Sequence, residues 1–262
     1  MSKKLLILAL LLLIIGGVGS YFTFSKSYPE EITSEKIVSS DMVEEIQIST
    51  DNATVEVLPT SDTETKVELV TKGVDVSKLD FTAEVEGQKL IIRLKEKSSF
   101  SIGFNIQSSH LYVYVPQKLY HSFVIDNDNG KVKMSELNIK NLNVQTDNGR
   151  IELNKIVSEN VDVKSANGRL DFNDVEGNIK GSSNNGKIVL ATKDLDRNIQ
   201  LESNNGKITI KTEKEPTNTT FKVSSHNGSI NILDKYEGNT VIGKGENLVD
   251  LKSDNGKIEV IK

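Results

Sequence analysis

The sequence predicts an all-β fold: a parallel β-solenoid with an irregular N-terminal β cap, preceded by one transmembrane helix. Three features predict it. An apolar run lies near the N-terminus, apolar and polar residues alternate through most of the remaining chain, and the dipeptide Asn-Gly recurs seven times in the second half. Alternation with a period of two is typical of β-strands, and a repeat near 20 residues is typical of solenoids. The expected units are residues 1–4 (cytoplasmic tail), 5–24 (membrane anchor), 25–36 (tether), 37–122 (β cap) and 123–262 (β-solenoid).

The N-terminal segment has the composition of a single-pass membrane anchor. Lys3 and Lys4 precede the apolar run Leu5–Ile15, and the apolar stretch continues to Phe24. Twenty helical residues at about 1.5 Å each reach about 30 Å, the thickness of the hydrocarbon core. The two lysines favour a cytoplasmic N-terminus, so the C-terminal domain is expected outside the cell membrane. A cleaved signal peptide is the alternative, because the apolar core is short and Val18-Gly19-Ser20 resembles a cleavage site.

The composition excludes several classes of function. The 262 residues include no Cys and three His, which excludes disulfides, thiolate catalysis and Cys-ligated zinc. The net charge of −5 becomes −7 once the two lysines of residues 1–25 are set aside. An acidic exported chain without basic runs is not expected to bind nucleic acid. Export without cysteine fits the envelope of a Gram-positive bacterium.

Seven copies of one pattern define the repeat. Each copy has an alternating strand, then Asn-Gly, then a second alternating strand, as in VQTDNGRIEL or LESNNGKITI. Asn and Gly tolerate positive φ, so we expect a sharp structural turn in each copy. These turn residues are Asn129-Gly130, Asn148-Gly149, Asn167-Gly168, Asn185-Gly186, Asn205-Gly206, Asn227-Gly228 and Asn255-Gly256.

A parallel solenoid explains the repeat better than a meander of hairpins. Asn-Gly between alternating segments is also a strong hairpin signal. However, the linkers carry their own alternating apolar residues, such as Leu137, Ile139 and Leu142, and equivalent positions hold the same residue type, as stacked coils require. We therefore expect an asparagine ladder at one corner and an inner apolar column at about 4.8 Å per coil. The column comprises Ile151, Leu170, Ile188, Ile208, Ile230 and Ile258.

The first half also predicts strands, without a regular repeat. The expected strands are residues 45–49, 54–57, 66–70, 89–94 and 110–116, and Glu86-Gly87-Gln88-Lys89 has the form of a hairpin turn. Residues 49–57 are a degenerate copy of the repeat, with Ala53 in place of glycine. Terminal repeats of a solenoid are atypical because they close an open end, so this half is expected to cap the rod. Residues 98–109 form a Ser-rich loop with alternating apolar residues, for which a strand and an exposed apolar tip are the two alternatives.

This order of elements resembles a known family. A tether, the strand DNATVEV, a hairpin, the strand LYVYVP and serial NGKI or NGRI copies are similar to the putative-adhesin family of bacterial envelope proteins, and within it to the membrane-anchored LiaG-like proteins of Firmicutes. The resemblance covers about residues 37–262. It implies a right-handed β-solenoid that faces outward from the cytoplasmic membrane, with a link to the envelope-stress response. It implies no enzymatic activity and no site residues, and the last glycine spacings, 22 and 28, depart from the regular repeat.

The residue after each Asn-Gly defines a candidate binding column. In a solenoid these residues would stack about 5 Å apart and could bind a polyanion such as wall or lipoteichoic acid. The competing interpretation is that acidic neighbours neutralise the column through exposed ion pairs, which contribute little. The column consists of Lys131, Arg150, Arg169, Lys187, Lys207 and Lys257, with Ser229 in one copy. The acidic neighbours are Asp128, Asp147 and Asp254 before the glycine, and Glu152, Asp171 and Glu259 after it.

No other pattern predicts a catalytic, cofactor or metal site. The calcium-binding nonapeptide needs Gly-Gly-x-Gly-x-Asp, which no copy contains. His226 occupies a variable position before Asn-Gly, and His110 and His121 flank a strand. No Ser-His-Asp, nucleotide-binding or metal-ligand spacing is present.

Three hypotheses about function follow from these patterns. We favour a non-catalytic envelope protein whose rod scaffolds or senses other envelope components. A surface adhesin or a module that binds an anionic wall polymer is the alternative, and a polysaccharide-active enzyme is the third. The expected partners are the membrane, through the N-terminal helix, and other envelope proteins or anionic wall polymers.

Overall fold

The computed structural model describes residues 31–262, except residue 75 and residues 98–107. The expected cytoplasmic tail and membrane anchor, the first part of the tether and most of the Ser-rich loop therefore lie outside the described residues. Within the described part, no helix combines the length and apolar character that crossing a bilayer requires.

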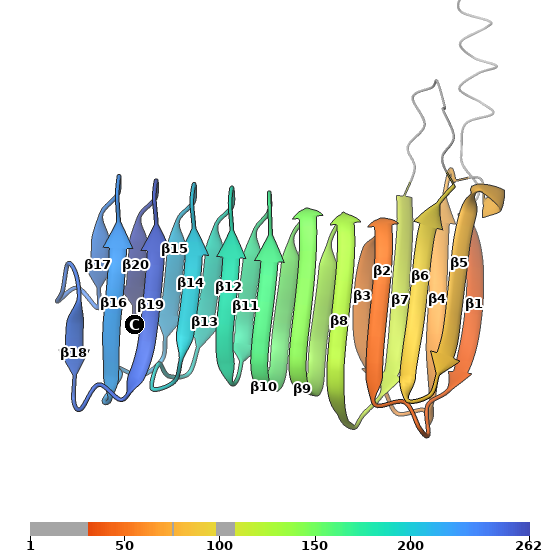
Figure 1. Cartoon of the computed structure of the whole chain (residues 1–262), viewed down its shortest axis with the longest axis horizontal. Coiled ribbons are helices and arrows are strands. Elements are labelled where there is room, and N and C mark those ends of the chain that lie inside the picture. Colours follow the sequence, from red (N-terminus) through yellow and green to blue (C-terminus); the bar gives the residue numbers. More distant parts are fainter. Residues whose placement is uncertain (1–30, 75, 98–107) are drawn as a thin grey trace, which may run out of the picture.

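The described chain is all-β and winds into a flattened rod of stacked coils, as the sequence predicts (Figure 1). A coil contributes one strand to each of two faces. The front face holds the strands that precede the Asn-Gly corners, and the back face holds the strands that follow them. The N-terminal elements are β1 (Glu31–Ser39), β2 (Glu45–Asn52), β3 (Thr54–Thr60), β4 (Glu64–Lys72), the 3-10 turn η1 (Val76–Lys78), β5 (Leu79–Glu86), β6 (Lys89–Glu96) and β7 (Ser108–Pro116).

The remaining strands form the regular part of the rod and its C-terminal end. They are β8 (Leu119–Asn129), β9 (Val132–Asn148), β10 (Ile151–Ser165), β11 (Leu170–Val175), β12 (Asn178–Ser183), β13 (Ile188–Thr192), β14 (Ile199–Ser203), β15 (Ile208–Thr212), β16 (Thr219–Ser225), β17 (Ile230–Ile232), β18 (Thr240–Ile242), β19 (Asn247–Ser253) and β20 (Ile258–Ile261). Coils pair in parallel, for example β9 with β10 over most of their length. The hairpin meander is therefore wrong, because each Asn-Gly joins strands of different faces.

A second bend lies opposite the Asn-Gly corner, where the chain passes from the back face to the front face. It falls inside the long strands β9 and β10, at Glu136 and Lys155, and at Asp174 of β11. All three have positive φ, between 52° and 56°. A non-glycine residue rarely adopts this conformation, so its recurrence at equivalent positions shows that the bend is built into the coil.

The core is a thin layer of apolar columns between the two faces. On the back face the register aligns Val132, Ile151, Leu170, Ile188, Ile208, Ile258 and Ile230. On the front face it aligns Phe123, Leu142, Val161, Ile179, Ile199, Val249 and Phe221. Nearly all of these side chains are fully buried. Identical positions of successive coils therefore pack directly on one another, which explains why the repeat preserves residue type.

The coils do not stack in sequence order at the C-terminal end. Strand β19 lies between β14 and β16, and β20 lies between β15 and β17. The coil of β19 and β20, which is last in the chain, therefore lies between the coil of β14 and β15 and the coil of β16 and β17 (Figure 1). The expected inner column is correct in its members, but Ile258 stacks between Ile208 and Ile230. The glycine spacings of 22 and 28 reflect this path. After the coil of β14 and β15, the chain first forms the outer coil of β16 and β17 and then returns to fill the place between them.

Antiparallel strands close both ends of the rod. At the N-terminal end β4 pairs with β7, β1 with β4, and β5 with β6, and at the other end β18 pairs with β16. The expected hairpin at Gly87 is confirmed by the pairing of Glu86 with Lys89. The tether prediction is wrong for residues 31–36, which belong to β1 and pair along its full length with β4. Strand β1 lies at an edge and is held by its pairing with β4, so its own sequence does not need strong alternation.

Candidate functional site

The Asn-Gly corner carries a continuous asparagine ladder. Each side-chain Nδ2 donates a hydrogen bond to the Oδ1 of the neighbouring asparagine on the N-terminal side, over 2.7 to 2.9 Å. The order along the rod is Asn52, Asn129, Asn148, Asn167, Asn185, Asn205, Asn255 and Asn227. Asn52 belongs to the degenerate copy, so the ladder extends into the N-terminal half. Each asparagine inside the ladder donates through its Nδ2 and accepts through its Oδ1, which fixes the alignment of successive coils along the rod.

The corner glycines are required by close packing and not by positive φ. The chain turns at each corner as expected, but among the seven glycines only Gly130 uses a positive φ, at 134°. A Cβ added to Gly168 would lie 1.6 Å from the carbonyl oxygen of Gly149, and one added to Gly186 would lie 1.7 Å from that of Gly168. Each glycine therefore rests directly on the backbone of the coil below.

A column of buried hydroxyl groups supports the same corner. The Oγ of Ser183 donates to the carbonyl of Gly168 over 2.9 Å, and the Oγ of Ser203 donates to that of Gly186 over 2.8 Å. Ser225 and Ser253 make equivalent bonds. These hydroxyls satisfy the glycine carbonyls that the corner buries. Sequence reasoning missed them, although Ser or Thr stands three residues before the glycine in six of the seven copies.

The basic residues after Asn-Gly stack beside an acidic column that neutralises part of them. Glu152 bridges Lys131 and Arg150, at 2.6 and 2.8 Å. Asp171 bridges Arg150 and Arg169, each at 2.7 Å. Glu259 likewise bridges Lys207 and Lys257, each at 2.6 Å. The acids three residues after the glycine therefore pair with two coils at once. Asp128, Asp147 and Asp254 make no ion pair with the column among the described residues.

The charge pairing lapses in the middle of the column. The acidic positions of the two central coils hold Val189 and Thr209, which align between Asp171 and Glu259. Lys187 is exposed and has no acidic partner among the residues that the structure describes. It lies between Arg169 and Lys207, whose charges are shared with acids of other coils. The column thus keeps one local excess of positive charge.

The pKa of Glu259 shows how strongly the acidic side chains interact with the basic column. Hydrogen bonds from the ammonium groups of Lys207 and Lys257 lower the pKa of its carboxyl group to about 2. An opposite charge that also donates a hydrogen bond favours the ionised carboxylate. Glu259 therefore stays charged at any physiological pH, and these two lysines are less available to an external anion than Lys187.

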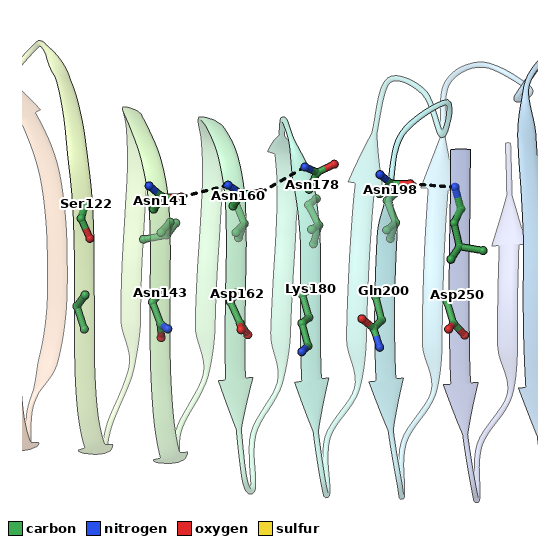
Figure 2. A pocket seen from close by; sticks show the side chains of 16 residues that line it. Ser122, Asn141, Asn143, Asn160, Asp162, Asn178, Lys180, Asn198, Gln200 and Asp250 are labelled. Carbon is green, nitrogen blue, oxygen red and sulfur yellow. Dashed lines mark hydrogen bonds between the residues drawn. The ribbon is translucent and has the colours of Figure 1, made fainter. Parts of the chain in front are cut away.

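A groove of about 620 Å³ on the front face is a second candidate site (Figure 2). It crosses the six strands β8, β9, β10, β12, β14 and β19. One row of its lining is a shorter amide ladder. Asn160 donates to Asn141 over 3.1 Å, Asn178 donates to Asn160 over 3.3 Å, and the Oδ1 of Asn198 accepts from the backbone of Leu248. These amides are already hydrogen-bonded, to one another or to the backbone of Leu248, so they form a polar edge of the groove.

The second row of the groove is not self-satisfied. The register aligns Asn143, Asp162, Lys180, Gln200 and Asp250 on adjacent strands. Asp250 is only 9% exposed, and its Oδ1 has no hydrogen-bond partner, as is also true of the buried Oδ1 of Asp162. The Oδ2 atoms of the two carboxylates lie 3.5 and 3.4 Å from Lys252 and Lys164. Sequence reasoning did not find this row, because its members differ from copy to copy.

The histidines and acids do not gather elsewhere. His110 stacks against Tyr112 on β7, with ring centroids 6.2 Å apart, and His121 and His226 are exposed. Among the described residues, no three His, Cys, Asp or Glu side chains are arranged to hold a metal ion.

Comparison with known proteins identifies the fold. The family model described as Toastrack DUF4097 matches residues 43–178 and 123–261. A putative adhesin from Bacteroides fragilis is 14% identical, with a TM-score of 0.52 over 89% of this chain and 99% of that one. A putative cell adhesion protein from Clostridium sporogenes is 17% identical, with a TM-score of 0.45 over 88% and 99%. A putative lipid binding protein from Parabacteroides distasonis is 16% identical, with a TM-score of 0.32 over 89% and 97%. No curated protein matches the chain.

Proposed function

The chain belongs to the Toastrack DUF4097 family, and we propose on this basis that it is a non-catalytic, membrane-anchored protein of the bacterial envelope. Its right-handed β-solenoid would project from the outer side of the cytoplasmic membrane and scaffold or sense other envelope components during envelope stress. The Bacteroides fragilis protein of similar fold is named a putative adhesin, and this name supports the proposal of a surface-binding role.

One observation carries this proposal: most polar side chains of the Asn-Gly corner form hydrogen bonds or ion pairs with the neighbouring coil. The asparagine ladder runs through all seven Asn-Gly copies, and three acids each bridge two coils of the basic column. Such a rod is rigid and presents an extended surface of side chains at fixed spacing, which is how solenoid proteins bind partners. A scaffold needs this rigidity, whereas an enzyme needs a cluster that interrupts the ladders.

The membrane anchor can be tested separately from the scaffold. Cells expressing the chain with a C-terminal tag are fractionated, and intact cells are treated with protease. We expect the tagged chain in the membrane fraction, accessible to protease, with an intact mass that includes residues 1–24. A mass that begins near residue 20 would show cleavage instead, and a protease-protected chain would refute the extracytoplasmic location.

The scaffold role predicts specific neighbours in the envelope. Cross-linking in living cells, before and during envelope stress, should capture the same envelope protein from the full chain. A control in which residues 1–36 are fused to an unrelated globular domain should not capture that protein. Deletion of the gene should change the output of an envelope-stress reporter, and restoration of the full chain should reverse the change. Equal capture by the control, or an unchanged reporter, would refute the scaffold role.

Binding of an anionic wall polymer is the second candidate, favoured by the unneutralised charge at Lys187. Retention of the full chain on beads coated with teichoic acid should fall as salt rises, because the attraction is electrostatic. Lys187→Gln should reduce retention more than Lys257→Gln, since Lys257 is engaged with Glu259. Absent or salt-independent retention would exclude this candidate.

A further inference from the structure

We infer that the groove on the front face binds a linear, uncharged glycan that lies along the rod and across the strands. This inference rests on the surface-binding role proposed above, but it uses a different surface from the basic column. The site is formed by Asp162, Lys180, Gln200 and Asp250, with the bonded amides of Asn160 and Asn178 at its edge.

The first argument is the unsatisfied carboxylate oxygens. Asp250 lines the groove and is 9% exposed, and its Oδ1 has no hydrogen-bond partner. The Oδ1 of Asp162 is unpartnered in the same way, three strands away. Each carboxylate is engaged only through its Oδ2, in an ion pair of 3.5 or 3.4 Å with Lys252 or Lys164. A carboxylate oxygen without a partner destabilises a fold, and native structures rarely retain one without a use. Both side chains line the groove, so a rotation that exposes the free oxygen would let the hydroxyl groups of a ligand donate to it.

The second argument is the order of charges along the row. Asp162, Lys180, Gln200 and Asp250 follow one another on adjacent strands, so acceptors alternate with donors (Figure 2). A polyanion would meet two carboxylates, and a polycation would meet the ammonium group of Lys180, which has no ion-pair partner among the described residues. A sugar hydroxyl both donates and accepts, so a polyhydroxylated neutral chain can satisfy every member of the row.

The third argument is the shape of the groove. It is open and crosses six strands, which at about 4.8 Å per strand gives a length of about 24 Å. This suits an extended chain of several units better than a single small molecule, because compact ligands occupy concave and mostly apolar pockets. The strand spacing places one polar side chain of the row beside each successive unit of a linear ligand.

The inserted last coil completes the site. Asp250 lies beside Gln200 only because β19 is placed between β14 and β16. If the coils stacked in sequence order, Lys222 of β16 would occupy that position, since it aligns with Asp250 in the observed register. The row would then end in Gln200 and a second cation, and it would lack its most buried acceptor. The irregular stacking thus determines the chemistry of the groove.

The test is a titration of the purified full-length chain with linear neutral oligosaccharides. Glucan, mannan and N-acetylglucosamine series of two to eight sugars are the probes, with oligogalacturonate as the anionic comparison. We expect affinity to rise with length up to about five sugars in at least one neutral series. Asp250→Asn and Lys180→Gln should weaken that binding about 10- to 100-fold, the effect of losing one charged hydrogen bond.

Two controls separate this inference from a loss of folding and from the basic column. Asp250→Asn should leave the melting temperature nearly unchanged, because it preserves the side-chain shape and removes only the 3.5 Å ion pair with the partly exposed Lys252. Asp147→Asn, at the exposed corner, and Lys187→Gln should leave the binding of neutral oligosaccharides unchanged. The absence of binding in all neutral series would overturn the inference, as would binding that Asp250→Asn and Lys180→Gln do not affect. Binding of oligogalacturonate alone, lost in Lys187→Gln, would overturn it and leave the polyanion candidate standing.

Discussion

Gly168→Ala tests whether close packing of the coils, and not backbone conformation, requires the glycine of each corner. The added Cβ would lie 1.6 Å from the carbonyl oxygen of Gly149 and 2.6 Å from the Oγ of Ser165. An ordinary van der Waals contact needs at least 3.4 Å. The carbonyl belongs to the backbone of the coil below, so no side-chain rotation relieves the clash. The two coils must separate at this corner by about 1.8 Å, a shift that overpacked cores resist.

The free-energy change can be worked from the bonds at that corner. Separation would stretch the bond from Asn167 to Asn148, now 2.9 Å, beyond hydrogen-bonding distance. It would also break the bond from the Oγ of Ser165 to the carbonyl of Gly149, now 3.4 Å. Two lost hydrogen bonds cost about 2 kcal/mol together. Overpacking adds about 1 to 3 kcal/mol. We therefore expect Gly168→Ala to lower the free energy of unfolding by about 3 to 5 kcal/mol.

Gly238→Ala is the matched control, because an added Cβ there meets nothing within 4 Å and φ is not positive. Its effect should stay within about 0.5 kcal/mol. Urea denaturation of both variants is followed by circular dichroism and by hydrogen exchange, since arrays of coils can lose a part before the whole. If Gly168→Ala unfolds within about 1 kcal/mol of Gly238→Ala, close packing does not explain the repeat.

Three further predictions concern the ladder, the charged column and the last coil. Asn167→Ala removes one donated and one accepted amide hydrogen bond and should lower the free energy of unfolding by about 1 to 2 kcal/mol. The control Asn143→Ala, at an exposed position of the front face, should change it by less than about 0.5 kcal/mol in the same denaturation assay. Because the pKa of Glu259 is lowered from 4.5 to about 2, its stabilising contribution is complete above pH 4.5 and is lost as the pH falls towards 2. Glu259→Gln should therefore cost about 1 kcal/mol at pH 7 and flatten the acid limb of the stability curve, and an unchanged limb would contradict the pairing with two lysines. Truncation after Glu246 removes four buried apolar side chains, each contributing about 1.5 to 3 kcal/mol, so amides of β14 and β15 should exchange far faster in the truncated chain. Equal protection of those amides would show that the last coil adds nothing to its neighbours.

The sequence predicts the coil because each copy encodes its own corner. Alternation around Asn-Gly identifies both strands, and the constancy of positions such as Ile188 and Ile208 predicts parallel stacking. The order of the coils is not encoded in the same way. The copies around Ile230 and Ile258 carry similar flanks, so either could lie next to Ile208. Their order follows from the lengths of the connections and from β18, which covers β16 and leaves room for β19.

The groove could not be predicted, because its members obey no repeat. Asp162, Lys180 and Gln200 occupy equivalent positions of three copies but differ in charge and size. Read along the chain, each is an ordinary exposed residue of a strand. Only the register places them side by side, and only the inserted coil adds Asp250. The basic column was visible because it does repeat, but its partial neutralisation depends on distances between coils that a single sequence does not contain.

The placement of the last coil makes the front-face groove depend on strand β19. This strand follows the other five strands of the groove in the chain, so the row can be completed only after residues 247–253 have been synthesised. A chain shortened before residue 247 would keep Lys180 and Lys222 but would lack Asp250, which lies between β14 and β16 in the complete chain. Its front face would therefore present a row with one carboxylate fewer and a different charge.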